Sequence, residues 1–237
     1  MTGFTGSPRA PACRPSVVLL DVFETTLAVD GVRERMVEHG RPAHEFDVFF
    51  ARVLRDGMAQ SLAGGSVPFV ELARAQLRTT SGLVGADGDD VLAAFRGLRP
   101  HPDVQPGLRA LASAGVGVWA FTHGAATVAE EALAEAGLGD LLAGVLSTEV
   151  LHTFKPPAAA YHWGCVQAGS APPRTALIAA HSWDTHGAVS AGLVAGLITR
   201  LEGWVNEAMA VPHVHAETFD EVVSALLALP ESVGVRD

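Results

Sequence analysis

The sequence is poor in cysteine and in clustered positive charge. Its 237 residues include two cysteines, Cys13 and Cys165, which are too few for a disulfide framework or for a cysteine-based metal knuckle. Lys and Arg together number 16 against 26 Asp and Glu, which gives a formal net charge of −10, and no basic run is present. We therefore expect no nucleic-acid partner, and we expect a cytoplasmic protein because two unpaired thiols fit a reducing compartment.

Long hydrophobic runs are also missing. The longest apolar stretches, such as residues 116–121, are far shorter than the roughly 18 residues that a membrane span needs. Residues 1–15 lack the apolar centre of a signal peptide, and we expect them to form a disordered lead-in. The sequence thus predicts no association with a membrane.

Residues 31–100 have the texture of a helical insert. Two stretches, residues 46–62 and 69–80, carry apolar side chains at helical spacing, and "AGGSVP" separates them. No convincing strand is present in this region. With 49% hydrophobic residues, the chain is long enough for one large domain that carries such an insert.

The rest of the chain alternates strands with helices. Short apolar runs at residues 17–20, 116–121, 144–147, 175–180 and 194–199 are separated by helical segments and by turns that contain glycine. This alternation predicts an α/β protein with a doubly wound, Rossmann-like parallel sheet and helices on both of its faces. We expect residues 16–30 and 101–237 to form this core and residues 31–100 to form an inserted helical domain.

Polar side chains follow four of the predicted strands. In a parallel sheet the carboxyl ends of the strands face one crevice, which is where ligands bind. These side chains combine two carboxylates, an ammonium group and several hydroxyls, a set that suits nucleophilic catalysis by a carboxylate. The residues concerned are Asp21, Thr25, Thr122, His123, Lys155, Tyr161, His181, Trp183 and Asp184.

Four short segments at these strand ends resemble a known family. "DVFETT", "FTHG", "FKP" followed by a tyrosine, and "HSWDTHGA" are similar to the four motifs of the haloacid dehalogenase superfamily. The resemblance covers about residues 16 to 200 and is closest to the type II branch, the L-2-haloacid dehalogenases. It implies that the helical insert is a cap domain.

The resemblance implies a hydrolase that cleaves the carbon–halogen bond of a small 2-haloacid. Asp21 would attack the halogen-bearing carbon and form an ester, and Lys155 would keep that carboxylate charged. Thr25 would brace the loop that carries Asp21. Thr122 and His123 would contact the substrate, in the place of a Ser–Asn pair of the family.

The same resemblance assigns the remaining candidates. Asp184 would lie near the water that hydrolyses the ester, and Tyr161 would support it. Trp183 would form a wall of the pocket, and His181 stands beside it where well-known members carry a small polar residue. A cap arginine would receive the substrate carboxylate because a guanidinium can hold it bidentately. Arg55 is the preferred candidate for this role, and Arg52 is the other.

Two residues depart from relatives in ways that bear on function. Phe23 stands where phosphatase relatives have a second aspartate, so it cannot protonate a leaving group. A halide needs no proton when it leaves. Metal-binding relatives also use several acids in the fourth motif, where this chain has only Asp184, so we expect no metal and no cofactor. Glu24 replaces a usual glycine. A phosphatase-like hydrolase and a non-catalytic relative are the alternatives, and a homodimer is common among type II relatives.

Each candidate also has a simpler interpretation. Asp21 and Thr122 are residue types that cap helices. Lys155 and the two arginines could lie on solvated surfaces, and Trp183 could belong to the core. His123 and His181 are equally compatible with structural roles, because an isolated histidine is often structural.

Overall fold

A computed structural model describes residues 12–231 of the chain. Its main sheet has six parallel strands in the order β5-β4-β1-β6-β7-β8. The strands are β1 (Val17–Asp21), β4 (Gly117–Thr122), β5 (Gly144–Ser147), β6 (Thr175–Ala179), β7 (Val194–Ile198) and β8 (Val214–Ala216).

Strand β1 lies in the middle of this sheet. Its residues Val17, Val18, Leu19 and Leu20 are buried, because helices cover both sides of the strand. β4 and β6 flank β1 in register, and Asp21 stands opposite Phe121. The predicted apolar run therefore forms the central strand, and its last residue lies at the carboxyl edge of the sheet.

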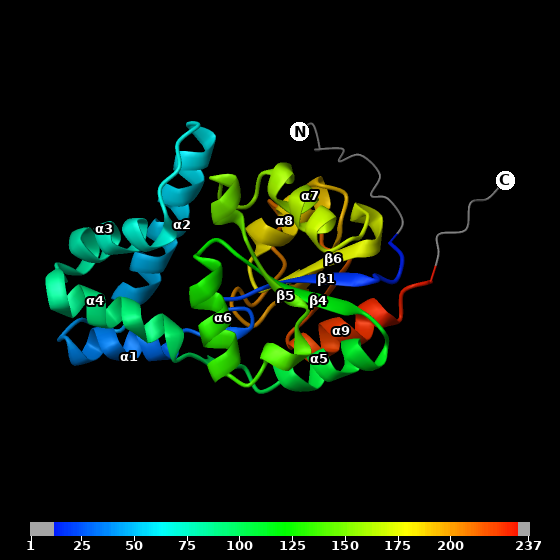
Figure 1. Ribbon diagram of the computed structural model, residues 1–237, viewed down its shortest axis with the longest axis horizontal. Helices are drawn as coiled ribbons and strands as arrows, with labels where there is room; N and C mark the ends of the chain where they lie inside the picture. The colour runs from blue at the N-terminus through cyan, green and yellow to red at the C-terminus, as the bar shows by residue number, and fades with distance from the viewer. Residues whose placement is uncertain (1–11, 232–237) are drawn as a thin grey trace.

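Helices cover both faces of the sheet, as Figure 1 shows, so the predicted α/β fold class is confirmed. α5 and α9 pack against each other on one side, while α7 and α8 pack together on the other. The helices of this part are α5 (Val104–Ser113), α6 (Ala126–Glu135), α7 (Ala158–Gln167), α8 (Ser182–Ser190) and α9 (Phe219–Leu227), and the short 3-10 turns are η2 (Gly139–Leu141), η3 (Thr148–Leu151) and η4 (Pro172–Arg174).

A second group of helices lies beside the sheet and contains no long strand (Figure 1). Phe46, Phe49 and Phe50 of α2 form the apolar centre of this helical layer, together with Phe69 of α3 and Phe95. The elements of the layer are α1 (Asp30–Glu38), α2 (Glu45–Leu62), α3 (Phe69–Ser81), α4 (Gly85–Ala93) and η1 (Ala94–Arg96).

The chain passes between the helical layer and the sheet twice, and the two connecting segments lie side by side. β2 (Leu27–Ala28) pairs with β3 (Arg99–Pro100) in a two-residue antiparallel ladder, and the backbone of His101 donates to Thr26 O. β3 falls inside the predicted insert, where no strand was expected. The chain therefore leaves the sheet and returns to it at one point, next to the end of β1.

The start of the described chain is packed, in contrast to the disordered lead-in predicted for residues 1–15. Residues 1–11 lie outside the described residues. Cys13 is buried and its thiol donates to Pro173 O, while the backbone of Arg14 donates to Pro230 O. The prediction is thus wrong for residues 12–15, because long-range contacts hold this segment against the sheet domain.

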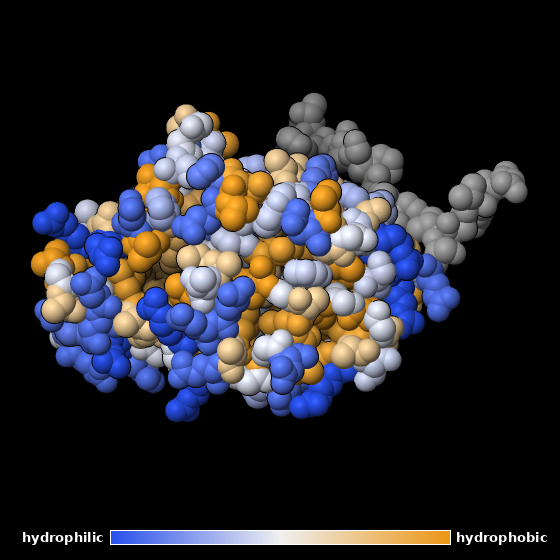
Figure 2. All heavy atoms as spheres, in the orientation of Figure 1, coloured by the Kyte–Doolittle hydropathy of each residue, from blue (hydrophilic) through white to orange (hydrophobic). Residues whose placement is uncertain are grey.

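The surface is mixed in character. Figure 2 shows hydrophilic side chains over much of the helical layer and apolar ones interspersed over the sheet domain. The exposed apolar side chains include Leu62 at the end of α2 and Trp204 in the loop after β7. Among residues 12–231, no helix combines the length and the apolar character that a membrane span requires.

Candidate active site

The carboxyl ends of β1, β4 and β6 bring a buried ion-pair cluster together. Lys155, the single lysine of the sequence, reaches into it from the loop after β5. Its ammonium nitrogen Nζ lies 2.9 Å from Asp21 Oδ1 and 2.6 Å from Asp184 Oδ2, and it also donates to Phe121 O at 3.3 Å. The Lys155 side chain is fully buried, so the interpretation as a surface lysine is wrong.

The second oxygen of Asp21 is held by Thr25. Thr25 donates from Oγ1 to Asp21 Oδ2 at 2.6 Å and accepts from the backbone N–H of Ala180 at 2.9 Å. Thr26 donates to the carbonyl oxygen of Asp21 at 2.6 Å. These bonds tie the loop after β1 to the end of β6 and fix the orientation of the Asp21 carboxylate.

Asp184 is held at the far side of Lys155 by the only tyrosine of the chain. Tyr161 donates to Asp184 Oδ1 at 2.6 Å, and its hydroxyl lies 3.1 Å from the carbonyl oxygen of Asp184. Gly187 lets α8 approach this hydroxyl, since a Cβ at position 187 would overlap it. Asp21, Lys155, Asp184 and Tyr161 are thus each fixed by at least one hydrogen bond of 2.6 Å.

Burial and charge act in opposite directions on the ionisation of this cluster. Burial favours the neutral form of Asp21, but the charge of Lys155 and the nearby His181 outweigh it and hold the pKa of Asp21 far below its ordinary value. Burial lowers the pKa of Lys155, but Asp184 and Asp21 raise it above its usual range. Asp21 is therefore an ionised carboxylate at neutral pH.

The pKa values of the two deeper members of the cluster, Asp184 and Tyr161, are both raised. Burial raises the pKa of Asp184, and the negative charge of Asp21 adds to this shift. Burial and the neighbouring Asp184 carboxylate raise the pKa of Tyr161 well above its ordinary value. Tyr161 therefore remains a hydrogen-bond donor throughout the physiological range.

His181 links Asp21 to Glu24. Its Nε2 lies 2.8 Å from Glu24 Oε2, and its Nδ1 lies 3.3 Å from Asp21 Oδ2 without the alignment of a hydrogen bond. Burial lowers the pKa of His181, but the Asp21 and Glu24 carboxylates raise it to about 10. At neutral pH His181 is an imidazolium between two carboxylates.

A small cavity opens beside the carboxylate of Asp21. Its volume is about 20 Å³, which is room for one water-sized molecule. The ring of His123 stacks between Phe154 and Trp183, with centroids 4.7 and 5.6 Å away. The residues that line the cavity are Asp21, Phe23, Phe50, Leu54, Phe69, Thr122, His123, Gly124, His181 and Trp183.

His123 is neutral in this position. Burial and the charge of Lys155 lower its pKa well below the ordinary value. Its Nδ1 accepts from the backbone N–H of Lys155 at 3.3 Å, which leaves the proton on Nε2. Thr122 is buried, and its Oγ1 accepts from the backbone of Gly124, so it caps its own turn while lining the cavity.

Comparisons with known proteins find similarity to haloacid dehalogenases. No family model matches the chain. An (S)-2-haloacid dehalogenase from Xanthobacter autotrophicus is 26% identical over 191 residues, which covers 78% of this chain and 75% of that protein.

Two solved structures share the fold over nearly their whole length. One L-2-haloacid dehalogenase has a TM-score of 0.84 and 22% identity, covering 92% of this chain and 100% of its own. The L-2-haloacid dehalogenase from Xanthobacter autotrophicus with chloropropionic acid covalently bound has a TM-score of 0.79 and 19% identity, covering 90% and 99%. The chain is thus similar to L-2-haloacid dehalogenases in sequence and shares their fold.

The two arginines predicted to bind substrate do not line the cavity. Phe50 and Leu54, four residues apart on α2, face it. Arg52 lies about 200° around the helix from Phe50 and donates to Thr80 Oγ1 at 3.1 Å. Arg55 is 64% exposed and pairs with the neighbouring Asp56 at 2.7 Å. The helix face that α2 presents to the cavity is apolar, and the substrate-binding role of Arg55 and Arg52 stays a prediction.

The apolar cap residues Phe50, Leu54 and Phe69 were missed in the sequence. Their signal is the i, i+4 spacing of Phe50 and Leu54 on one helix face, but this pattern equally predicts a core contact. Trp183 had two interpretations in the sequence, a core residue or a wall of the pocket. Its side chain is half-buried and also lines the cavity. Glu24 was noted as unusual, and its partner His181 lies 157 residues away, where no local pattern could reveal it.

The described residues offer no cluster of metal ligands. Within residues 12–231, no three His, Cys, Asp or Glu side chains are grouped in a way that could hold a metal ion. Phe23, two residues after Asp21, packs its ring against Phe95 at 5.2 Å and Phe69 at 6.5 Å. The environment of the cavity is therefore aromatic on the side of Phe23.

Proposed function

We propose that the chain is a hydrolase that displaces halide from a small 2-haloacid through an ester on Asp21. The observation that carries this proposal is the state of Asp21, a buried, ionised carboxylate at the edge of a cavity. Lys155 and Thr25 hold its two oxygens at 2.9 and 2.6 Å. Because little water surrounds it, the carboxylate is a better nucleophile than it would be in solution.

We assign the other site residues from their contacts. Lys155 keeps Asp21 charged, and Asp184 with Tyr161 keeps Lys155 in place. Thr25 orients the nucleophile. Thr122, His123, His181 and Trp183 form the substrate side of the cavity, as its lining supports.

The aromatic surroundings of Phe23 favour halide displacement over phosphoryl transfer. A phosphatase of this superfamily needs a proton donor for its leaving oxygen, and the phenyl ring of Phe23 offers none. Halide departs as a stable anion, so no acid is required there. A magnesium-dependent phosphatase is accordingly the less favoured alternative.

Substrate must displace side chains in order to bind. A cavity of about 20 Å³ accommodates a single water and is too small for a haloacid. Phe50, Leu54 and Phe69 of the helical layer close it on one side, so we propose that residues 31–100 act as a cap domain that moves away from the sheet. The apolar lining favours the smallest haloacids, with two or three carbons.

Chloride release tests the proposal directly. The purified chain should release chloride from 2-chloropropionate without added metal, and Asp21→Asn should abolish the release. No release from any member of a panel of chloro- and bromo-substituted acetates and propionates would refute the proposed activity. Hydrolysis of a generic phosphoester with magnesium would instead support the phosphatase.

A second candidate is the same displacement on a small uncharged organohalide. Among residues 12–231, no arginine or lysine lines the cavity. The two cations next to Asp21, Lys155 and His181, are already paired with carboxylates. 2-Chloropropionamide is an uncharged counterpart of 2-chloropropionate, and chloride release from the amide alone would favour this second candidate.

We also propose a cytoplasmic location and a homodimer. The two cysteines, Cys13 and Cys165, are both free and buried, which fits a reducing compartment. Light scattering coupled to size exclusion measures the assembly, and a mass of one chain at all concentrations would refute the dimer.

A further inference from the structure

We propose that His181, held by Glu24, is the general base that activates the water for hydrolysis of the ester on Asp21. This inference rests on the proposed function, because it needs the ester to form. It gives a catalytic role to a histidine that stands in place of a small polar residue, and a positioning role to Glu24.

The imidazole of His181 is hydrogen-bonded at one nitrogen and only ion-paired at the other. Nε2 is fixed by Glu24 at 2.8 Å. Nδ1 lies 3.3 Å from Asp21 Oδ2 but makes no aligned hydrogen bond in the described chain, although His181 is only 6% exposed. A buried polar atom without a hydrogen bond is costly, and it points to a ligand that completes the site.

The position of Nδ1 suits a water that attacks Asp21. Nδ1 lies 3.3 Å from Asp21 Oδ2, and His181 and Asp21 line the same water-sized cavity. A water bound to Nδ1 therefore lies next to the carbon of the Asp21 carboxyl group. General bases act at hydrogen-bond distance from the proton they take, and this arrangement meets that requirement.

The backbone of Glu24 supplies an independent indication. Its φ is +66°, in the left-handed region that glycine adopts freely and other residues at a cost. His101 Nε2 lies 3.2 Å from the carbonyl oxygen of Glu24 and helps to hold this conformation. A strained residue whose side chain orients a buried histidine indicates a functional constraint rather than a stabilising one.

The reaction balances with His181 as the carrier of one proton. Asp21 attacks the halogen-bearing carbon, the carbon–oxygen bond forms, and halide leaves with the electron pair of the broken bond. The ester is neutral, so His181 loses the negative charge that favoured its protonated form and releases its Nδ1 proton to solvent. Its Nε2 proton stays on the hydrogen bond to Glu24.

Neutral His181 then takes a proton from water at Nδ1 while hydroxide adds to the carboxyl carbon of Asp21. The tetrahedral intermediate expels the product alkoxide, which receives the proton from Nδ1 and leaves as the 2-hydroxyacid. The carboxylic acid left on Asp21 passes its proton to Nδ1, and the ion pair of the resting site is restored. The net products are the alcohol, halide and one proton.

Several charged groups set the titration of His181. Asp21 at the end of β1 and Glu24 in the following turn favour the imidazolium, while burial opposes it. Lys155 and the neutral His123 also stand beside the cavity. Because esterification removes the Asp21 charge, the pKa of His181 falls from about 10 in the intermediate, which allows the base to form near neutral pH.

Rapid-quench kinetics with 2-chloropropionate test the proposal by separating ester formation from ester hydrolysis. His181→Asn should release about one chloride per active site in a burst and then slow, with the adduct accumulating in the intact-protein mass. The expected loss in hydrolysis rate is about 10²- to 10⁴-fold, as is typical of a missing general base. The wild type should lose hydrolysis rate at low pH, and His181→Asn should lack this acid limb.

Two substitutions of Glu24 and a surface control complete the design. Glu24→Gly relieves the left-handed backbone, so it should fold at least as well as the wild type while slowing hydrolysis in the same direction as His181→Asn. Glu24→Gln keeps a hydrogen-bond acceptor and should retain more activity than Glu24→Gly. His44→Asn, on the exposed N-terminal end of α2, should leave both steps unchanged.

The outcomes are distinguishable. No chloride burst from the wild type overturns the proposed function itself. If the wild type shows a burst but His181→Asn hydrolyses the ester at an unaltered rate, only the role of His181 is overturned. If His181→Asn does not fold, the same result in Glu24→Gly has this meaning. Loss of the burst itself in His181→Asn, in a folded protein, also contradicts it by placing the histidine in the first step.

Discussion

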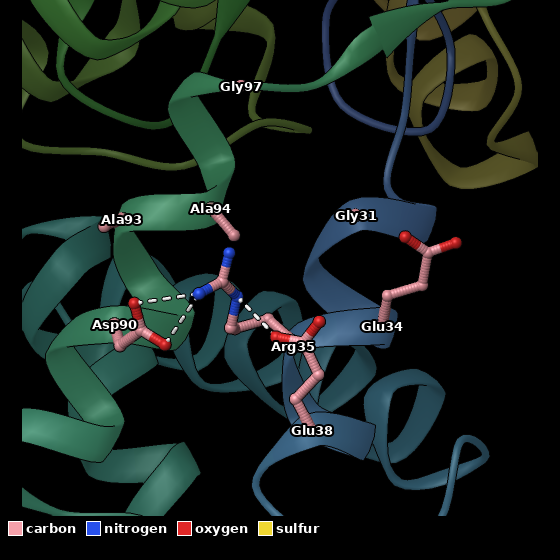
Figure 3. A pocket seen from close by; sticks show the side chains of 8 residues that line it. All are labelled: Gly31, Glu34, Arg35, Glu38, Asp90, Ala93, Ala94 and Gly97. Carbon is pink, nitrogen blue, oxygen red and sulfur yellow. Dashed lines mark hydrogen bonds and ion pairs between the residues drawn. The ribbon is translucent and has the colours of Figure 1, made fainter.

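Two clusters of ion pairs in this molecule are built from similar side chains but differ in burial. One surrounds Lys155 at the carboxyl edge of the sheet, where its ammonium group bridges two carboxylates. The other lies on the helical layer, where Arg35 of α1 pairs with Asp90 of α4 and with Glu38, each at 3.1 Å. Figure 3 shows the Arg35 guanidinium between these two carboxylates, with Glu34 pointing away from it.

The pocket around Arg35 is much the larger of the two, about 350 Å³ against about 20 Å³ at Asp21. The side chains of Arg35, Glu38 and Asp90 are 42% to 66% exposed, whereas Lys155 and Asp184 are fully buried. Water and salt screen the exposed pairs, so their geometry has little energetic consequence. The size and polarity of a pocket therefore do not identify the candidate active site in this molecule. The buried, desolvated charges beside the smaller pocket identify it.

The largest effect should follow from breaking the buried cluster at its centre. Lys155→Met leaves Asp21 and Asp184 as uncompensated buried acids, which typically costs about 3–5 kcal/mol of stability. Urea unfolding should show this loss, and chloride release should disappear with it. A Lys155→Met protein of wild-type stability would mean that the carboxylates are solvated and that the comparison with the surface cluster fails.

A smaller effect should follow from crowding the support of the cluster. A Cβ on Gly187 would overlap the Tyr161 hydroxyl and come within 2.6 Å of Pro156 Cβ. Gly187→Ala should cost about 1–3 kcal/mol, the usual penalty of overpacking, and should reduce activity by displacing Asp184. Gly97→Ala is the matched control, because nothing lies within 4 Å of its added Cβ and its φ of −96° suits alanine.

Stability should also depend on pH through His181. Its pKa is about 10 in the folded chain, against about 6.5 when unfolded. Because the pKa is raised on folding, protonated His181 stabilises the fold fully below about pH 6.5, and this stabilisation is lost as pH rises through about 10. The free energy of unfolding should fall across this window by at most about 1.4 kcal/mol per pH unit. Urea midpoints across this window should fall for the wild type and stay flatter in His181→Asn; equal slopes would refute the buried imidazolium.

The smallest effect should come from the surface cluster. Arg35→Ala removes the centre of the larger pocket, yet we expect its urea midpoint and its chloride release to match those of the wild type, since its pairs are exposed to solvent. A clear loss of either property would show that the outer pocket matters more than its exposure suggests.

The sequence predicted the strand-end residues because their placement depends on local order. Each apolar run ends at a polar residue, and a parallel sheet brings those ends together whatever the detailed packing. The helical insert was predictable for the same reason, from the spacing in α2 and α3. Strand β8 was not predicted, because it has only three residues, Val214 to Ala216, and none of them is fully buried.

The cap side of the cavity depends on information that a single sequence does not carry. Each helix residue advances the side chain by about 100°, so a small rotation of α2 decides whether Arg52 or Phe50 faces Asp21. The pairing of Glu24 with His181 depends on the fold bringing two distant loops together. Tertiary packing, and not local pattern, therefore determines the electrostatics around Asp21.

Mass spectrometry of the quenched enzyme tests the central claim most directly. The wild type is mixed with 2-chloropropionate, quenched in acid within one turnover, and digested. We predict a mass increase equal to the substrate without its chlorine, replacing one proton, on the peptide that contains Asp21, and no increase in Asp21→Asn. Chloride release without an adduct, or an adduct on any other residue, would contradict the account.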